Sequence, residues 1–150
     1  MAARPAEPEI VVVGVDGSEA AVRAAHFALA HLRSERARLL VCHVVPWSPF
    51  TKQSAEENER RRVAKADETE QAWSDIVQPL VDSVGGAGVE VEGLVQHGHP
   101  AEVLCDVARQ RGASHLVVGR RGHSRVRALL FGSTPSNLIQ LATVPVTVVP

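Results

Sequence analysis

The chain has 150 residues, of which 45% are hydrophobic and 22% are charged, with a net charge of −1. That length and apolar fraction suit one compact domain, and a near-neutral chain is not expected to be a general binder of nucleic acid or of anionic membrane surfaces. No apolar run approaches the roughly 18–20 residues that a bilayer span needs, so we expect a cytoplasmic protein that makes no membrane contact.

The first third of the chain reads as a leader, a strand, a helix and a second strand. Residues 1–9 are polar and contain two prolines, which indicates a flexible leader. Ile10–Val15 and Leu39–Val45 are continuous runs of mainly β-branched and aliphatic residues, typical of strands buried on both faces. Between them, apolar residues at spacings of three and four predict a helix from Gly17 to about Arg33. Residues 47–54 are expected to be a loop.

The remainder continues the same alternation. A long polar helix is predicted over about 55–83, and Pro79 should end or bend it because proline removes a backbone donor. Further helices should begin at Pro100, ending at Gly112, and cover Ser133–Leu141. The three later strands are predicted at Val89–Gln96, His115–Val118 and Val144–Val149.

This order predicts an α/β fold in which a parallel sheet is covered by helices on both faces, as one domain over residues 10–150. In such sheets a ligand binds beyond the carboxyl ends of the strands, where the strand order reverses. The segments that follow strands are therefore the places to look for function. They are Asp16-Gly17-Ser18, Pro46 onward, His97-Gly98-His99 and Gly119 onward.

The segment after the fourth strand favours an anion. Gly119 and Gly122 allow close approach of backbone to a ligand, and Gly132-Ser133 begins a helix whose free N–H groups attract phosphate. From Val107 to Pro150 there are six arginines and no acidic residue, and four of the arginines lie between Gly119 and Gly132. Together these features predict a phosphate site. In the alternative interpretation Ser133 caps a helix and the arginines form a solvated face.

These residues also resemble a known family. The spacing G-x2-G-x9-G-[ST], at Gly119, Gly122, Gly132 and Ser133, is similar to the nucleotide loop of the universal stress protein family. Four further blocks resemble it in the same order, and the resemblance covers about residues 10–150. The blocks are VVVGVDGSEAA at 11–21, VCHVVP at 41–46, HGHPAEVL at 97–104 and VPVTVVP at 144–150.

The resemblance implies a three-layer sandwich of the adenine nucleotide alpha hydrolase-like type, with a five-stranded parallel sheet in the order 3-2-1-4-5. It also implies a stress-response protein that binds an adenine nucleotide, ATP first and ADP, AMP or cyclic AMP as alternatives, with Mg²⁺ accompanying the nucleotide. The residues it assigns to that nucleotide are Gly14, Val15, Asp16, Val44, Val118, Gly119, Arg121, Gly122, Gly132, Ser133 and Thr134. It further implies a homodimer formed through the closing strand Val144–Val149.

One position departs from the family pattern. Pro135 stands where the family often has a second serine or threonine, so a hydroxyl and a backbone N–H that could meet a terminal phosphate are both absent. Thr134 or Ser136 could compensate. ATP therefore shares the prediction with nucleotides that carry fewer phosphates.

Other interpretations stay open beside nucleotide binding. Asp16 could be a catalytic carboxylate or metal ligand, although ribose binding or helix capping is favoured, and slow ATP hydrolysis is a second hypothesis. A dimeric interaction module without nucleotide is a third. His97 and His99 could bind a metal, but no third ligand lies nearby in sequence. Cys42 and Cys105 show no metal-ligand spacing and are expected to be reduced and largely buried.

Overall fold

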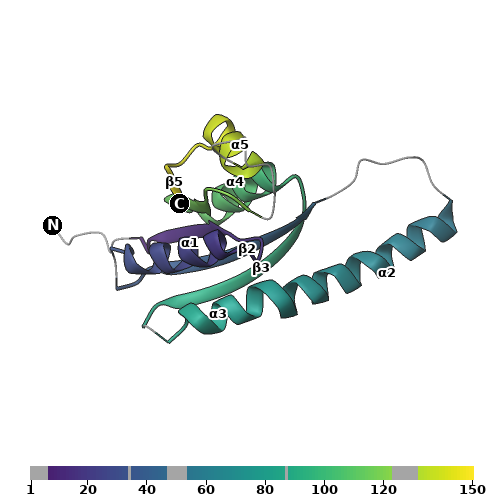
Figure 1. Ribbon diagram of the computed structural model, residues 1–150, viewed down its shortest axis with the longest axis horizontal. Helices are drawn as coiled ribbons and strands as arrows, with labels where there is room; N and C mark the ends of the chain where they lie inside the picture. The colour runs from purple at the N-terminus through teal and green to yellow at the C-terminus, as the bar shows by residue number, and fades with distance from the viewer. Residues whose placement is uncertain (1–6, 34, 47–53, 87, 123–131) are drawn as a thin grey trace.

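A computed structural model describes residues 7–33, 35–46, 54–86, 88–122 and 132–150 of the chain. It contains a five-stranded sheet in the order β3-β2-β1-β4-β5, with every neighbouring pair parallel (Figure 1). The strands are β1 (Ile10–Gly14), β2 (Arg38–Pro46), β3 (Glu90–Gly98), β4 (His115–Gly119) and β5 (Val146–Val149). The predicted fold class and strand order are confirmed.

Helices cover both faces of the sheet. They are α1 (Glu19–Ala30), α2 (Ala55–Ala72), the π-helical turn η1 (Trp73–Val77), α3 (Gln78–Val84), α4 (Pro100–Arg111) and α5 (Ser133–Leu141). Successive strand residues point to opposite faces, so Val11 and Val13 pack against α1 and α3, whereas Val12 packs against α4 and α5. None of the helices in the described ranges is both long enough and apolar enough to cross a membrane.

Side chains with a local role set the helix ends. The Ser18 hydroxyl accepts the N–H of Ala21 at 3.2 Å and begins α1, and Ser54 with Glu57 forms a capping box that begins α2. Gly112 ends α4 with φ of +63°, a left-handed conformation that glycine adopts without steric cost. The end predicted at Gly112 is therefore confirmed.

Pro79 does not end the long helical segment. The preceding turn widens into η1, where the N–H of Gln78 bonds to the carbonyl of Trp73 five residues earlier. Pro79 then falls in the first turn of α3, directly after this widened turn, and the chain stays helical to Val84. The widened turn is how the segment accommodates the proline.

Near the ends of the chain, one predicted boundary shifts and the expected leader makes a backbone contact. The last strand begins at Val146 rather than Val144, because Pro145 has no N–H for the ladder, although its carbonyl accepts the N–H of Leu116 at 2.9 Å. Within the expected leader, the Glu9 carbonyl accepts the N–H of Arg38 at 2.8 Å. Residues 1–6 and most of the predicted loop 47–54, including Trp47, lie outside the described residues.

The helical segment packs on the sheet through a close contact between Trp73 and Gly93. A methyl group at Gly93 would lie 2.6 Å from Val77 Cγ1 and 2.8 Å from two carbons of the Trp73 ring. Trp73 is therefore a packing residue on β3.

We expect Gly93→Ala to destabilise the protein by about 1–3 kcal/mol, since the added methyl group overpacks this contact. Urea unfolding would measure the change. The matched control is Val63→Ala on α2, whose side chain is 51% exposed and should change stability by no more than about 0.5 kcal/mol. Unfolding of Gly93→Ala at the wild-type midpoint would contradict the packing described here.

Candidate functional site

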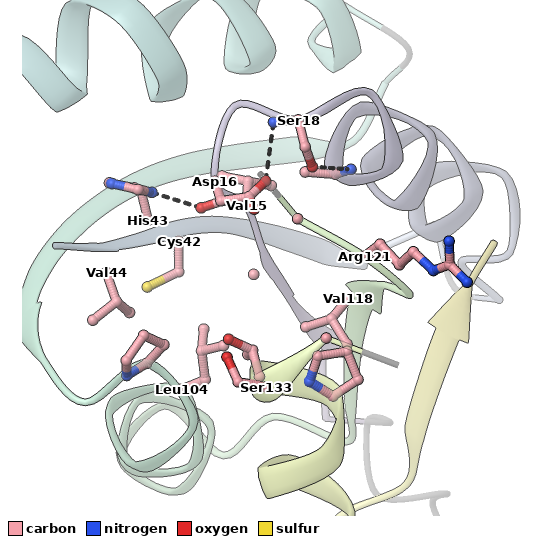
Figure 2. A pocket seen from close by; sticks show the side chains of 18 of the residues that line it. Val15, Asp16, Ser18, Cys42, His43, Val44, Leu104, Val118, Arg121 and Ser133 are labelled. Carbon is pink, nitrogen blue, oxygen red and sulfur yellow. Dashed lines mark hydrogen bonds between the residues drawn. The ribbon is translucent and has the colours of Figure 1, made fainter. Parts of the chain in front are cut away.

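A cavity of about 360 Å³ opens at the carboxyl ends of β1, β2 and β4 (Figure 2). It lies where the strand order reverses, since β1 has β2 on one side and β4 on the other. The position is the one at which open α/β sheets bind ligands. The volume falls within the range of small-molecule pockets.

All the residues that the resemblance assigned to a nucleotide line this cavity. Those from the first two strands and their ends are Gly14, Val15, Asp16 and Val44. Those from β4 and the segment that follows it are Val118, Gly119, Arg121, Gly122, Gly132, Ser133 and Thr134. The structure thus brings together residues up to 120 positions apart. Their contact with a nucleotide stays a prediction.

The lining also includes residues that the resemblance did not assign to the nucleotide: Ser18, Ala21, Cys42, His43, Pro46, Pro100, Leu104 and Pro135. Alternation along β2 could have indicated Cys42, because Cys42 and Val44 lie two residues apart and share a face. Leu104 comes from the far side of the crevice, on α4, and nothing in local spacing places it there.

One wall of the cavity is apolar. Val44, Leu104 and Val118 are each no more than 6% exposed, and their side chains project toward the cavity (Figure 2). The Cys42 thiol lies on the same wall, and burial raises its pKa to about 12. A wall of this kind suits the face of a flat, weakly polar ring.

Asp16 is the carboxylate in the described lining of the cavity, and the local backbone holds it in place. Its Oδ1 accepts the N–H of Ser18, the residue that caps α1, at 2.9 Å (Figure 2). A methyl group at Gly122 would overlap Oδ2 of Asp16, so the loop after β4 approaches this carboxylate closely at a residue without a side chain. The two loops that face each other across the crevice therefore meet at Asp16 and Gly122.

Two backbone N–H groups at the N-terminus of α5, next to the cavity, make no backbone hydrogen bond within the described residues. The Gly132 N–H is already bonded to the Arg120 carbonyl at 2.9 Å, and Pro135 has no N–H. The N–H groups of Ser133 and Thr134 remain, at the positive end of the helix dipole.

Of the two residues that could compensate for Pro135, only Thr134 lines the cavity. The Ser136 hydroxyl instead donates to the carbonyl of Gly132 at 2.9 Å. The anion site predicted at Gly132-Ser133 therefore has fewer hydrogen-bond donors than the family pattern implies.

The described arginines of the loop contribute little positive charge to the cavity. Arg121 lines it, but its guanidinium extends away from it (Figure 2). Arg120 is exposed, and its N–H donates to the Val149 carbonyl at 2.6 Å. Arg125 and Arg127, on which the predicted cluster also depends, lie outside the described residues, as does His123.

The alternative prediction of a metal site at His97 and His99 is not supported by the described residues. The His97 side chain is 8% exposed, and its Nε2 lies 3.9 Å from Glu68 Oε2. Burial first, and then the charge of Lys65, lowers the pKa of His97. Within the described ranges no three His, Cys, Asp or Glu side chains are grouped so as to hold a metal ion.

The sheet order and the crevice define a class: an α/β protein with the adenine nucleotide alpha hydrolase-like fold. Within that class, the sequence model of the universal stress protein family matches residues 8–150. The chain therefore belongs to the universal stress protein family.

Two relatives show how far the sequence similarity extends. Universal stress protein YxiE of Bacillus subtilis is 27% identical over 93% of this chain and 97% of its own length. A universal stress protein of Thermus aquaticus is 30% identical over 93% of this chain and 96% of its own. Each is similar along nearly its whole length.

Solved structures share the fold. Hypothetical protein MJ0577 superposes with a TM-score of 0.79 at 22% identity, covering 94% of each chain. A universal stress protein in complex with cAMP gives 0.64 at 24% identity, over 95% of this chain and 96% of that one. A family member from Arabidopsis thaliana with AMP bound gives 0.60 at 20% identity, over 95% and 91%.

The two cysteines should differ in reactivity. Cys42 is fully buried with a pKa of about 12, whereas Cys105 is only partly buried. Because the thiolate is the reactive form, we expect iodoacetamide at pH 8 to alkylate Cys105 well before Cys42 in the folded protein. Peptide mapping by mass spectrometry measures both sites, with urea-unfolded protein as the control for equal labelling. Equal rates in the folded protein would contradict the placement of Cys42.

Proposed function

We propose that this universal stress protein binds an adenine nucleotide, ATP in the first place, as a regulatory ligand in the crevice between β1 and β4. One observation carries the proposal. The residues that the family resemblance assigns to the nucleotide, which come from separate segments of the chain, all line a single cavity. The relatives solved with cAMP and with AMP support the adenine nucleotide class.

The base would lie against the apolar wall formed by Val44, Leu104 and Val118. The pairing of β1 with β2 stops at Gly14–Cys42, and the Val15 N–H then donates to the Cys42 carbonyl at 2.9 Å. Alternate residues direct their peptide groups to the same edge of a strand, so the N–H and carbonyl of Val44 face this open edge. A neighbouring donor and acceptor match N1 and the amino group of adenine.

The phosphates would lie at the N-terminus of α5, where Ser133 and Thr134 supply two N–H donors. Because Pro135 removes one N–H donor from this helix, AMP and cyclic AMP become competitors of ADP and ATP. Mg²⁺ would enter with the phosphates of ATP, because Mg²⁺ is commonly held by substrate phosphates and one or two carboxylates. Asp16 is the carboxylate in the described lining that could assist.

Slow ATP hydrolysis at the same site is the alternative, and it would need a general base to activate water. Asp16 is the carboxylate in the described lining that could take this role. Nucleotide binding would act instead by joining β2, β4 and α5 through one ligand.

We further propose a cytoplasmic homodimer that pairs through the closing strand, Val144–Val149. β5 is the last strand of the sheet order, and on the neighbouring helix Ile139 is 63% and Leu141 46% exposed. A paired edge would cover both the strand and these side chains. The free thiols of Cys42 and Cys105 suit a reducing compartment.

The binding proposal predicts opposite effects of Gly132→Ser on stability and on affinity. Gly132 has φ of −66° and ψ of 170°, which is ordinary N-cap geometry for serine, so the unliganded variant should be at least as stable as wild type. The new hydroxyl would accept the Thr134 N–H and compete with phosphate. We expect the affinity for AMP and ATP to fall about tenfold, since a hydrogen bond to a charged group is lost.

Isothermal titration calorimetry would measure this effect with ATP, ADP, AMP and cyclic AMP, and native mass spectrometry would report any nucleotide that copurifies. Gln110→Ser, on the exposed side of α4, is the control and should bind as wild type does. The absence of binding heat and of copurified nucleotide in the wild type would refute the proposed function. Equal affinities of wild type and Gly132→Ser would contradict binding of the phosphate at the N-terminus of α5.

The dimer proposal predicts twice the monomer mass of 16.1 kDa in sedimentation velocity at micromolar concentration. Replacing both Ile139 and Leu141 by serine should shift the equilibrium toward monomer, because the apolar surface beside β5 is lost. Val63→Ser removes an equally exposed apolar side chain from α2 and should leave the dimer intact. A wild-type monomer at these concentrations would refute pairing through the strand.

A further inference from the structure

We propose that His43 is a positioning residue that keeps the base-binding edge of β2 open by holding the carbonyl of Val15. The part of this inference that concerns adenine rests on the proposed function. The part that concerns the strand edge does not depend on a ligand.

The hydrogen-bond pattern of a parallel sheet identifies the bond that is missing at this edge. Gly14 is paired with Cys42, and the Cys42 carbonyl accepts the N–H of Val15. In a regular parallel ladder the next bond would run from the Val44 N–H to the Val15 carbonyl. That bond would extend the pairing of β1 with β2 by one more step and use the donor that faces the cavity.

The His43 side chain bonds to the Val15 carbonyl in place of the Val44 N–H. Its Nδ1 lies 2.7 Å from the Val15 carbonyl oxygen (Figure 2). A carbonyl oxygen can only accept, so Nδ1 carries the proton and donates it. In the described part of the chain the Val15 carbonyl accepts no bond from the Val44 N–H. The histidine therefore supplies a hydrogen bond to a partly buried carbonyl that has none from the neighbouring strand.

Two adjacent residues of β2 have the two roles: Val44 lines the site of the base, and His43 bonds to the Val15 carbonyl. Neighbouring side chains of a strand point to opposite faces, so Val44 faces the apolar wall whereas the His43 ring lies on the other side of the strand (Figure 2). There it lies with Val45 beside Glu68 of α2. The second ring nitrogen, Nε2, points away from the cavity (Figure 2). His43 can thus fix the Val15 peptide without occupying the space of the base.

Removal of the imidazole donor would release the Val15 carbonyl. A buried carbonyl without a partner is unfavourable, and the nearest ladder donor is the Val44 N–H. We expect the strands to close by one step, which would withdraw the donor from adenine and leave the N-terminus of α5 unchanged. Loss of His43 should therefore weaken binding of the base but not binding of a phosphate group alone.

The test compares His43→Leu, which lacks the donor, with His43→Asn, whose amide nitrogen can stand near the place of Nδ1. Amide hydrogen exchange followed by NMR reports on the Val44 N–H directly. In the unliganded wild type we expect this amide to exchange faster than those of Val41 and Val45, and to become protected when AMP binds. In unliganded His43→Leu it should already be protected, at least about tenfold more than in wild type.

Affinities give the second readout. AMP should bind His43→Leu about tenfold more weakly, whereas His43→Asn should retain near wild-type affinity and ribose 5-phosphate should bind both variants equally. The control is His115→Leu. His115 is also a half-buried strand histidine, bonded to Thr147 at 2.6 Å, and its loss should change neither readout.

Two results would overturn the inference: a Val44 amide in the unliganded wild type that is as protected as that of Val41, or His43→Leu with unchanged Val44 exchange and AMP affinity. If His43→Leu fails to fold, the Val44 exchange rate in the wild type and the AMP affinity of His43→Asn still test the role of His43. If the wild type binds no adenine nucleotide, the proposed function fails, and the exchange of Val44 in the unliganded protein still tests the role of His43.

Discussion

The site depends on the point at which the chain reverses its direction across the sheet. From β1 the chain moves outward through β2 to β3, and it then returns to the other side of β1 to form β4 and β5. Because parallel crossovers are right-handed, the two directions place their helices on opposite faces. The segments that leave β1 and β4 therefore diverge, and the crevice between them cannot be closed by sheet hydrogen bonds. The cavity is a result of topology, and the residues around it adapt that opening to a ligand.

Several residues of the crevice serve both the fold and the cavity. Gly122 lets the loop after β4 approach Asp16, whose carboxylate is also tied to the turn that begins α1. Gly132 connects α5 to Arg120 through its N–H, and the next two N–H groups of the helix make no backbone bond within the described residues. Pro135 fits the first turn of that helix but removes one donor. The same geometry therefore favours a phosphate and limits how much of a polyphosphate the helix can hold.

Much of this arrangement could be predicted from the sequence. The Val-rich strands, the serine that caps α1 and the glycine that ends α4 are local signals, and each of these elements is present in the structure. The family resemblance supplied the strand order, which no local pattern contains. The residues assigned to the nucleotide come together because they lie near or just beyond the carboxyl ends of β1, β2 and β4, or at the N-terminus of α5.

The remainder depends on contacts between distant segments. Pro79 is accommodated by a widened turn, which requires a π-helical bond from Gln78 to Trp73 that spacing does not predict. Ser136 could have faced the cavity, but its hydroxyl bonds to Gly132. The contact of His43 with the Val15 carbonyl depends on the register of β1 on β2, which no local pattern shows.

The central claim is that adenine lies between β1 and β4 against Val44, Leu104 and Val118. Intermolecular nuclear Overhauser effects between unlabelled AMP and methyl-labelled protein test it most directly. The account predicts cross-peaks from adenine H2 and H8 to the methyl groups of these three residues, and none to the exposed methyl groups of Val63. Bound AMP with cross-peaks elsewhere and none to these residues would contradict it.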